Sequence, residues 1–227
     1  MGASGRVSVI IPWASDTPCY HRRSALAWAV SQWADTGCEV IIGEHTGRWC
    51  KALAVEDGLS RARGDILVVA DADVWSLGWQ AAVKKVVEGV PWAMPHGRVH
   101  RLTHAATQHV LDGNEPAHGM GLVQPPYQGW PGGGVVVVRR DVYATTPLDP
   151  RFVGWSGEDE SWAHALTVLH GPGWRGQAPL WHLWHPPQER MSRRWGSYAA
   201  QALATRYARA RTRERMRALL DEAHQPV

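Results

Sequence analysis

The sequence predicts an α/β fold, an open mixed sheet flanked by helices, because of two patterns. Short apolar runs rich in Val and Ile alternate with segments of helical apolar spacing in the first half of the chain. Such runs are typical of strands buried on both faces of a sheet, and the alternation is typical of right-handed crossover connections. The second pattern is an apolar stripe at helical spacing over residues 193–223, which predicts one long C-terminal helix.

The alternation is clearest in the first 95 residues. The run VSVIIP at residues 7–12 and the run ILVVA at residues 66–70 are short and β-branched, as buried strands are. The elements expected here are strands at residues 6–12, 39–43, 65–70 and 92–94 and helices at residues 22–34, 49–61 and 79–87.

Residues 96–131 interrupt the pattern, because Gly, Pro, His and Gln predominate and only a short helix near 103–111 is expected. Loops of this length are usually functional or mobile. A strand at 132–139, a helix at 158–169 and a strand at 178–184 then return to the earlier pattern. We expect these elements to complete the same sheet.

The composition indicates a soluble chain with its own core. The 227 residues are 44% hydrophobic and 20% charged, and the longest apolar stretches fall far short of the roughly 20 residues that a membrane-spanning helix needs. Cys19, Cys38 and Cys50 lack CxxC spacing, which argues against a disulfide framework or a zinc site. The N-terminal residues do not have the pattern of a signal peptide. We therefore expect a cytoplasmic protein.

Two aspartates, Asp71 and Asp73, follow the third expected strand. In open α/β sheets ligands bind beyond the carboxyl ends of the strands, and residues two apart point the same way while the strand continues. Two such carboxylates can hold a divalent cation together with a sugar hydroxyl. The alternative is a turn with a helix cap before the next helix.

Four segments, in this order, resemble the GT-A fold glycosyltransferases, enzymes that move a sugar from a nucleotide sugar to an acceptor. They are KALAVEDGLSRARGDILVVADADV, GWPGGGVVVVRRDVY, GWSGEDESW and LWHLWHPP. The later segments are similar to β-1,4-galactosyltransferases and polypeptide N-acetylgalactosaminyltransferases. The resemblance implies a GT-A domain at 1–188, with a nucleotide-sugar half at 1–95 and an acceptor and catalytic half at 96–188, followed by a basic helical extension at 189–227.

The resemblance also implies a metal-dependent enzyme that uses Mn²⁺ or Mg²⁺ and a nucleotide sugar. Asp73 would bind the metal directly, and Asp71 would bind the ribose and the metal shell. The diphosphate gains negative charge as the glycosidic bond breaks, and a cation stabilises that charge. His185 matches the second histidine of the family's HxxH motif and is the expected third ligand.

We expect only one of the two histidines to reach the metal. A strand places residues three apart on opposite faces. His182 would then be a packing residue or a supporting partner of the ligands.

Glu158 and Asp159 follow Gly157 and resemble the GGED segment of inverting transferases. The resemblance implies that Asp159 is the general base that takes the proton of the acceptor hydroxyl and that Glu158 orients the acceptor or donor. Relatives that retain the anomeric configuration tend to have Asn where Asp159 stands, which favours inversion. The alternative is that these acids complement the dipole in the first turn of a helix.

Other donor contacts follow from the same resemblance. Family members often have an Asp that binds uracil at the position of Glu44. Glu44 could take its place, so a UDP-sugar is favoured, but the departure from Asp leaves the identity of the nucleotide base open. Gly133 and Gly134 would let the backbone approach the sugar closely. Trp130 and Trp155 would form a stacking wall for the acceptor, with core packing as the alternative. The remaining candidate donor-binding residues are Pro12, Trp13, Arg22, Arg48, Lys51 and Ala72, and surface ion pairs are the alternative for Arg22 and Arg48.

The C-terminal segment carries a charge excess. From residue 189 to the end there are nine Arg and four acids, whereas residues 1–188 carry fifteen Lys and Arg against seventeen acids. The expected helix either packs on the domain with a solvated basic face, attracts a polyanion such as DNA, or touches a membrane surface.

Two other functions stay open. A haloacid-dehalogenase-like phosphatase also places two Asp after a strand, but Trp75 stands at the fifth position of its motif and the pair lies deep in the chain. A nucleic-acid-binding module would use the Arg-rich helix and Trp residues but leaves Asp71, Asp73 and Asp159 unexplained. The acceptor of a transferase stays open, with a soluble glycan, a protein or a modified nucleic acid favoured.

Overall fold

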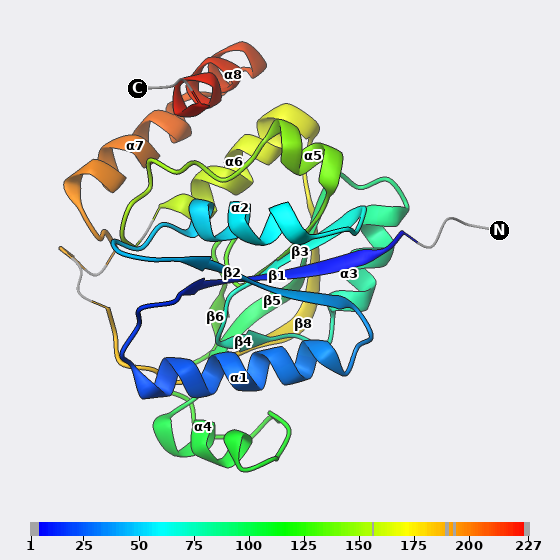
Figure 1. Cartoon of the computed structure of the whole chain (residues 1–227), viewed down its shortest axis with the longest axis vertical. Helices are drawn as coiled ribbons and strands as arrows, with labels where there is room; N and C mark the ends of the chain where they lie inside the picture. The colour runs from blue at the N-terminus through cyan, green and yellow to red at the C-terminus, as the bar shows by residue number, and fades with distance from the viewer. Residues whose placement is uncertain (1–4, 156, 189–190, 193, 225–227) are drawn as a thin grey trace.

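A computed structural model describes residues 5–155, 157–188, 191–192 and 194–224 of the chain. Its centre is an eight-stranded mixed sheet with the strand order β2-β1-β3-β7-β5-β8-β4, and β6 pairs with β5 (Figure 1). The strands β2, β1 and β3 are parallel, whereas β7 is antiparallel to both of its neighbours. The predicted fold class, an open mixed α/β sheet flanked by helices, is confirmed.

The first half of the chain follows the predicted alternation. Its elements are β1 (Val7–Ala14), α1 (Tyr20–Ala34), β2 (Glu39–His45), α2 (Lys51–Arg61), β3 (Ile66–Ala70), β4 (Val74–Trp75) and α3 (Trp79–Val87). The helix bounds differ from the predicted ones by at most two residues, because the apolar spacing that marks each helix also packs it on the sheet. The two-residue strand β4 has no periodicity of its own and was not predicted.

The second half agrees less closely with the predicted bounds. Its elements are β5 (Trp92–Arg101), α4 (His104–Leu111), β6 (Tyr127–Gln128), β7 (Val135–Arg139), α5 (Arg140–Thr145), α6 (Glu158–His170) and β8 (Trp174–His182). The strand β5 extends well beyond the predicted residues 92–94, because Pro95 and Gly97 lie at register shifts that the ladder to β8 absorbs.

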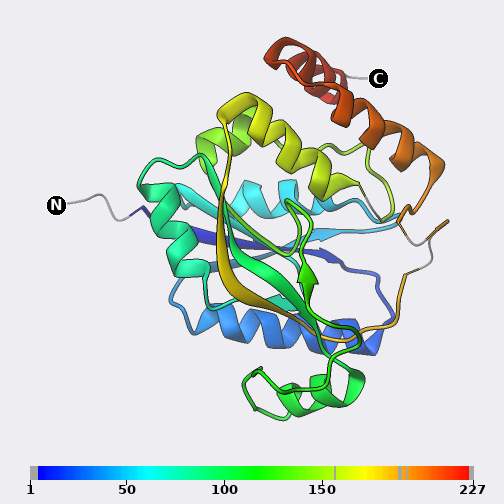
Figure 2. The same cartoon turned by 180° about the vertical axis from the view of Figure 1, so that it is seen from behind.

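The sheet has apolar side chains on both faces. Ile10 belongs to the cluster under α2, α5 and α6, whereas its neighbours Val9 and Ile11 belong to the cluster under α1 and α3. This alternation is the period of two expected for a strand buried on both sides. Figures 1 and 2 show the two helix layers on opposite faces of the sheet.

The prediction of one long C-terminal helix is wrong. The segment forms two helices, α7 (Tyr198–Arg209) and α8 (Arg213–Asp221), followed by a 3-10 turn at Glu222–His224. Ala210 leaves helical geometry, and the hydroxyl of Thr212 accepts from Arg215 N–H to begin α8. The break lets Tyr207 and Met216 both pack in the cluster that contains Leu169 of α6. Residue 193, where the helix was predicted to begin, lies outside the described residues.

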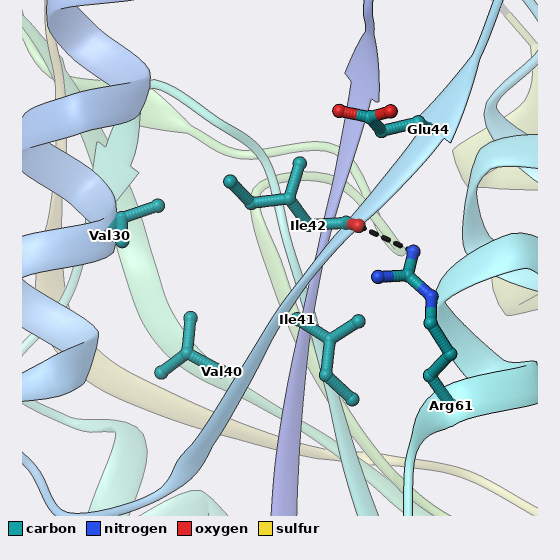
Figure 3. Close-up of a pocket in the computed structure, with 6 residues that line it drawn as sticks. All are labelled: Val30, Val40, Ile41, Ile42, Glu44 and Arg61. Atoms are coloured by element: carbon teal, nitrogen blue, oxygen red, sulfur yellow. Dashed lines mark hydrogen bonds between the residues drawn. The ribbon is translucent and has the colours of Figure 1, made fainter.

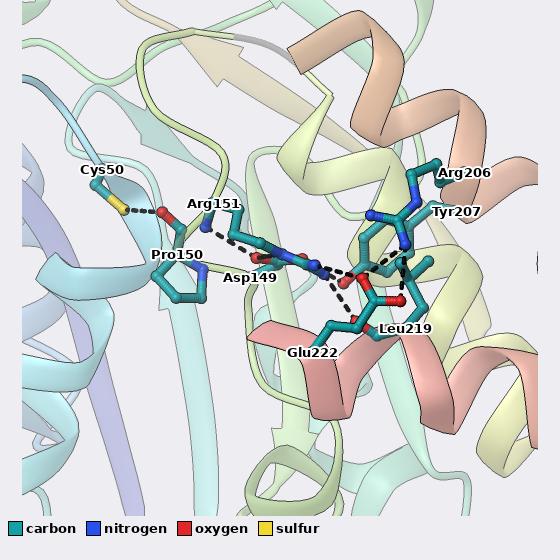
Figure 4. Close-up of polar contacts among 8 residues, drawn as sticks. All are labelled: Cys50, Asp149, Pro150, Arg151, Arg206, Tyr207, Leu219 and Glu222. Atoms are coloured by element: carbon teal, nitrogen blue, oxygen red, sulfur yellow. Dashed lines mark hydrogen bonds and ion pairs between the residues drawn. The ribbon is translucent and has the colours of Figure 1, made fainter. Parts of the chain in front are cut away.

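A polar network fixes the helix pair α7–α8 to the loop before α6 (Figure 4). The Asp149 side chain, 2% exposed, binds Arg151 at 2.7 Å and accepts from the Tyr207 hydroxyl at 2.8 Å. Arg151 continues to the carbonyl of Leu219 and to Glu222 of the 3-10 turn. The network therefore joins the last turns of both helices to one loop.

Across the described residues, no helix is both long and apolar enough to span a bilayer.

Candidate active site

The candidate site lies beyond the carboxyl end of β3, where the backbone of β7 holds the following segment. Asp71 N–H donates to the Gly134 carbonyl at 2.8 Å, and Gly134 N–H donates to the Asp71 carboxylate at 3.1 Å. Gly134 has φ +78° and an added Cβ would lie 2.5 Å from Leu180. Glycine is therefore required where this loop meets Asp71.

Asp73, His182 and His185 form one cluster, called here the histidine–aspartate cluster. Their possible ligand atoms all lie within 4.8 Å of one another. His185 Nε2 is 3.1 Å from one carboxylate oxygen of Asp73, and His182 Nε2 is 3.8 Å from the other. Each of the three side chains is at most 14% exposed. Asp73 is held by its backbone as well, since its carbonyl accepts from Leu183 N–H.

The two rings present the same nitrogen to Asp73. Nδ1 of His182 lies 2.8 Å from the Leu183 carbonyl, and Nδ1 of His185 lies 2.8 Å from the Pro186 carbonyl. A carbonyl only accepts, so these contacts assign a proton to Nδ1 of each ring, and Nε2 is the nitrogen that each ring presents to Asp73. Burial lowers the pKa of His182 to about 4, which keeps this ring neutral at pH 7. Burial alone would raise the pKa of Asp73, but the positive charge that His182 can carry, a hydrogen bond from His185 and the nearby Arg22 hold that pKa well below its usual range.

The expectation that only one imidazole reaches the metal rested on a strand that continues through residue 184, whereas β8 ends at His182. The chain then turns, so the alternation of faces no longer applies and both Nε2 atoms lie beside Asp73.

Lys51 is the centre of a second group, called here the lysine–carboxylate cluster. Its ammonium lies 2.7 Å from Asp71 and 2.7 Å from Asp159, and its side chain is 7% exposed. Lys51 is the first residue of α2 and Asp159 belongs to the first turn of α6, so two helix N-termini meet the end of β3. Although burial opposes the charge, the two carboxylates raise the pKa of Lys51, which stays protonated.

Glu158 and Asp159 have different environments within this group. Burial raises the pKa of Asp159 to about 6, against the opposing effect of Lys51. Burial and the charge of Asp159 raise the pKa of Glu158 to about 8. Oε2 of Glu158 is buried and has no hydrogen-bond partner among the described residues. At neutral pH Asp159 is therefore the ionised member and Glu158 the protonated one.

The glycine loop before β7 lies against Asp159. An added Cβ on Gly133 would be 3.4 Å from a carboxylate oxygen of Asp159, and one on Gly132 would be 2.1 Å from its carbonyl. The loop therefore packs closely on the first turn of α6, and glycine is required at position 132. Trp130 is 57% exposed, and the Arg194 guanidinium lies over its ring, 5.2 Å from the ring centre. Trp155 is partly buried.

The other candidate donor contacts lie in different places. Arg22 is near enough to contribute to the low pKa of Asp73 and donates to the Pro186 carbonyl at 3.4 Å. Pro12 is buried and Trp13 partly buried at the end of β1, and Ala72 is partly buried between the two aspartates. Arg48 is exposed. Lys51, expected at the diphosphate or base, is instead engaged by two carboxylates.

Glu44 lies at the outer edge of the sheet. It lines a surface hollow along the edge strand β2 with Val30, Ile42 and Arg61 (Figure 3). The side chain is exposed, and its backbone N–H donates to Asp57 at 2.8 Å. It belongs to neither the histidine–aspartate cluster nor the lysine–carboxylate cluster.

Sequence reasoning missed the position of Arg194 and treated His182 as a supporting residue. The HxxH spacing was visible, but the end of β8 that turns both rings to one side was not. The stack of Arg194 between Trp130 at 5.2 Å and Trp195 at 5.1 Å joins segments far apart in the chain. No local pattern marks such a contact.

No family model and no curated protein sequence matches the chain. Among solved structures, GalNAc-T7 with UDP, GalNAc and Mn²⁺ matches with a TM-score of 0.55 and 13% identity, over 91% of this chain and 48% of that one. The chain thus spans about half the length of the GalNAc-T7 structure.

Two further matches are more distant. Glucosyl-3-phosphoglycerate synthase from Mycobacterium tuberculosis, with Mn²⁺, UDP and phosphoglyceric acid, has a TM-score of 0.48 and 16% identity, over 99% of this chain and 81% of that one. A mutant of Drosophila β-1,4-galactosyltransferase 7, with manganese, UDP-Gal and xylobiose, has a TM-score of 0.44 and 15% identity, over 76% and 65%. With the mixed sheet and its helix layers, the GalNAc-T7 match shows that the chain has the GT-A glycosyltransferase fold.

Proposed function

We propose that the protein is a metal-dependent glycosyltransferase that moves a sugar from a nucleotide sugar, with a UDP-sugar favoured, to an acceptor hydroxyl. The observation that carries this proposal is the histidine–aspartate cluster beside the carboxyl end of β3. Ligands of open α/β sheets bind at this edge. The GT-A fold match was obtained with a structure that holds UDP, GalNAc and Mn²⁺, which supports the choice of donor and metal.

The donor set of the cluster fits a divalent cation. Two ligand atoms that are each about 2.1 Å from a shared cation lie about 3 Å apart when they are adjacent in its shell. The distance of 3.1 Å between His185 Nε2 and Asp73 Oδ2 matches this spacing, and the distance of 3.8 Å to His182 is within a small rotation of it. Imidazole and carboxylate ligands together suit Mn²⁺ and similar ions.

In this proposal Asp73, His182 and His185 hold the metal, which stabilises the charge that develops on the leaving diphosphate. Asp71 lies between the two clusters and is assigned to the ribose or to the metal shell. Arg22, beside Asp73, is assigned to the diphosphate. Pro12, Trp13 and Ala72 would line the nucleotide, and we assign no nucleotide contact to Glu44.

Asp159 is proposed as the general base of an inverting transfer. Its carboxylate takes the proton of the acceptor hydroxyl as that oxygen bonds to the anomeric carbon, and the bond from this carbon to the diphosphate oxygen breaks. A general base works best when its pKa is near the working pH, and burial raises that of Asp159 to about 6. Oε2 of Glu158 is buried, so in this proposal the protonated Glu158 orients the acceptor or donor through its place beside Asp159 and not by direct contact.

The phosphatase alternative is not favoured. Asp71 follows the third strand of the chain, whereas the motif of such phosphatases lies near the first strand, and Trp75 stands at the fifth position of that motif.

The proposal is tested by calorimetric titration of Mn²⁺ into protein with UDP. We expect His185→Ala and His182→Ala each to weaken Mn²⁺ binding by about tenfold or more, because each removes a ligand. His109→Ala is the matched control, since His109 is exposed on α4. Equal Mn²⁺ affinity in all three variants and the native protein would remove the cluster from the proposed function.

A further inference from the structure

The outer surface of the helix pair α7–α8 is a charged surface that the proposed chemistry does not use. It is called here the arginine face, and its exposed members are Arg209, Arg211, Arg213, Arg215 and Arg217. In the part of the chain that the structure describes, none of these five guanidinium groups forms an ion pair, whereas Arg206 is paired with Glu222. The remaining nearby acids, Glu214 and Asp221, leave a positive excess on this surface.

The opposite side of the same helices is already buried. Leu203, Tyr207, Met216 and Leu219 pack in the cluster with α6, and each is at most 9% exposed. A helix that lies on a membrane needs a free apolar face. The apolar face of α7–α8 is already buried against α6, so the exposed charge of the pair is suited to binding a polyanion in water.

A shallow hollow runs along the exposed side of α7. It is lined by Tyr198, Gln201, Ala202, Thr205, Arg206 and Arg209. These residues span the whole helix, a length of about 18 Å at 1.5 Å per residue. Tyr198 at the start of the hollow is 79% exposed, and Arg209 is at its far end. An aromatic ring and a guanidinium group thus lie at the two ends of this α7 hollow.

The α7 hollow begins beside Asp159, the candidate base. Arg194, four residues before Tyr198, lies over the ring of Trp130, and the Trp130 carbonyl accepts from Gly133 N–H. Gly133 is the residue whose added Cβ would meet the Asp159 carboxylate. Gly157, which precedes α6, lies against Trp195 and Ala204. The start of α7 therefore adjoins the mouth of the site.

We propose that the acceptor is a nucleic acid strand, which the arginine face and the α7 hollow hold while a hydroxyl of the strand reaches Asp159. This inference rests on the proposed function. Arginine binds phosphate oxygens with two parallel hydrogen bonds, and residues 189–227 contain nine Arg and no Lys. Exposed Tyr198 and Trp130 offer flat faces on which bases stack. Phosphate contacts and stacking together are the means by which proteins bind nucleic acid strands.

The binding test uses fluorescence anisotropy of a labelled 20-nucleotide DNA strand, its duplex and an RNA strand of equal length, at several salt concentrations. The double variant Arg209→Gln with Arg215→Gln should bind more weakly. Its slope of log affinity against log salt should be shallower by about 1.4 on a single strand, since each lost phosphate contact removes about 0.7. Lys84→Gln with Lys85→Gln removes the same charge from α3 and should leave the slope unchanged.

Stacking is tested separately with Tyr198→Ala. We expect binding to weaken by about fivefold or more while the salt slope stays as in the native protein, because stacking releases no counterions. An unchanged affinity of Tyr198→Ala for the nucleic acid strands would exclude Tyr198 from the binding surface.

The outcomes separate this inference from the proposed function, because binding of UDP with Mn²⁺ is measured on the same samples. The Arg209→Gln, Arg215→Gln protein should bind UDP and Mn²⁺ like the native protein. Native protein that binds UDP but none of the three nucleic acids would overturn the inference alone, as would binding of heparin in their place. Nucleic acid binding without any UDP binding would overturn the acceptor role together with the proposed function.

Discussion

At the scale of single residues, Lys51 determines how the carboxylates of the site share charge. It lies 2.7 Å from both Asp71 and Asp159, with little exposure to solvent. A buried carboxylate beside an ammonium group is ionised more easily than one without such a neighbour. The proton of the group therefore stays on Glu158, and Asp159 is left free to accept one.

The role of Asp159 is tested by Asp159→Asn, which keeps the shape of the side chain and removes its basicity. We expect the turnover of donor and acceptor to fall by about a hundredfold or more, while Mn²⁺ and UDP bind nearly as before. Glu160→Gln is the control, because Glu160 is also in the first turn of α6 but pairs with Arg194 at the surface. Transfer at the native rate by Asp159→Asn would exclude this residue as the base.

The raised pKa of Glu158 predicts a loss of stability as pH rises. Burial and Asp159 move its pKa from 4.5 to about 8 in the folded chain. Between these values the unfolded chain has released this proton and the folded chain has kept it, so the free energy of unfolding falls with rising pH. Above about pH 8 the loss is complete.

Urea denaturation between pH 5 and 9 measures this effect. The decline in the free energy of unfolding should be shallower in Glu158→Gln, which has no proton to lose. A decline of the same slope in both proteins would show that Glu158 ionises normally.

At the scale of elements, the C-terminal segment shows where sequence periodicity misleads. Ala and Arg favour helix throughout residues 198–221, so the composition does not mark the break at Ala210. The break serves packing, because a straight helix could not bring both Tyr207 and Met216 against α6. Tertiary contacts of this kind override local propensity and leave no local signal.

The network around Asp149 predicts that the Tyr207 hydroxyl of α7 contributes to the free energy of unfolding. Tyr207→Phe removes the hydrogen bond of 2.8 Å to the buried Asp149 carboxylate, which keeps Arg151 as a partner. We expect the free energy of unfolding to fall by about 1–2 kcal/mol in urea denaturation. Tyr198→Phe is the control and should change nothing, since Tyr198 is 79% exposed. An equal stability of Tyr207→Phe and the native protein would mean that this bond adds no net stability.

The polar network around Asp149 also contacts the residue next to the lysine–carboxylate cluster. The Pro150 carbonyl, next to Asp149, accepts from Cys50 Sγ, and Cys50 immediately precedes Lys51 (Figure 4). The helix pair is therefore packed against the loop that supports two members of the site, Lys51 and Asp159.

At the scale of the whole molecule, the strands and helices of the first half could be predicted because each is marked by its own apolar period. The order of the strands could not, since β7 lies between β3 and β5 and pairs residues such as Leu67 and Val138. Asp71, Asp73 and Asp159 were predicted as site residues from motifs. The bridge that Lys51 makes between Asp71 and Asp159 depends on this long-range order, and so does the approach of both histidines to Asp73.

The edge of the sheet is also a property of the whole molecule. The outer edge of β2 is covered in part by α2, because Arg61 donates to the Ile42 carbonyl at 2.7 Å (Figure 3). Asp57 of α2 also accepts from Glu44 N–H. Side chains that occupy edge groups hinder the addition of a further strand. The hollow at this edge is thus explained by protection of the sheet.

The proposed metal site is tested most directly by anomalous diffraction from crystals grown with Mn²⁺ and UDP. We predict one strong manganese peak, about 2.0–2.3 Å from a carboxylate oxygen of Asp73 and from Nε2 of His182 and His185. The UDP diphosphate should complete the coordination. A manganese peak beside Asp71 and Asp159 in place of Lys51, or UDP bound with no metal at the histidine–aspartate cluster, would exclude this cluster as the metal site.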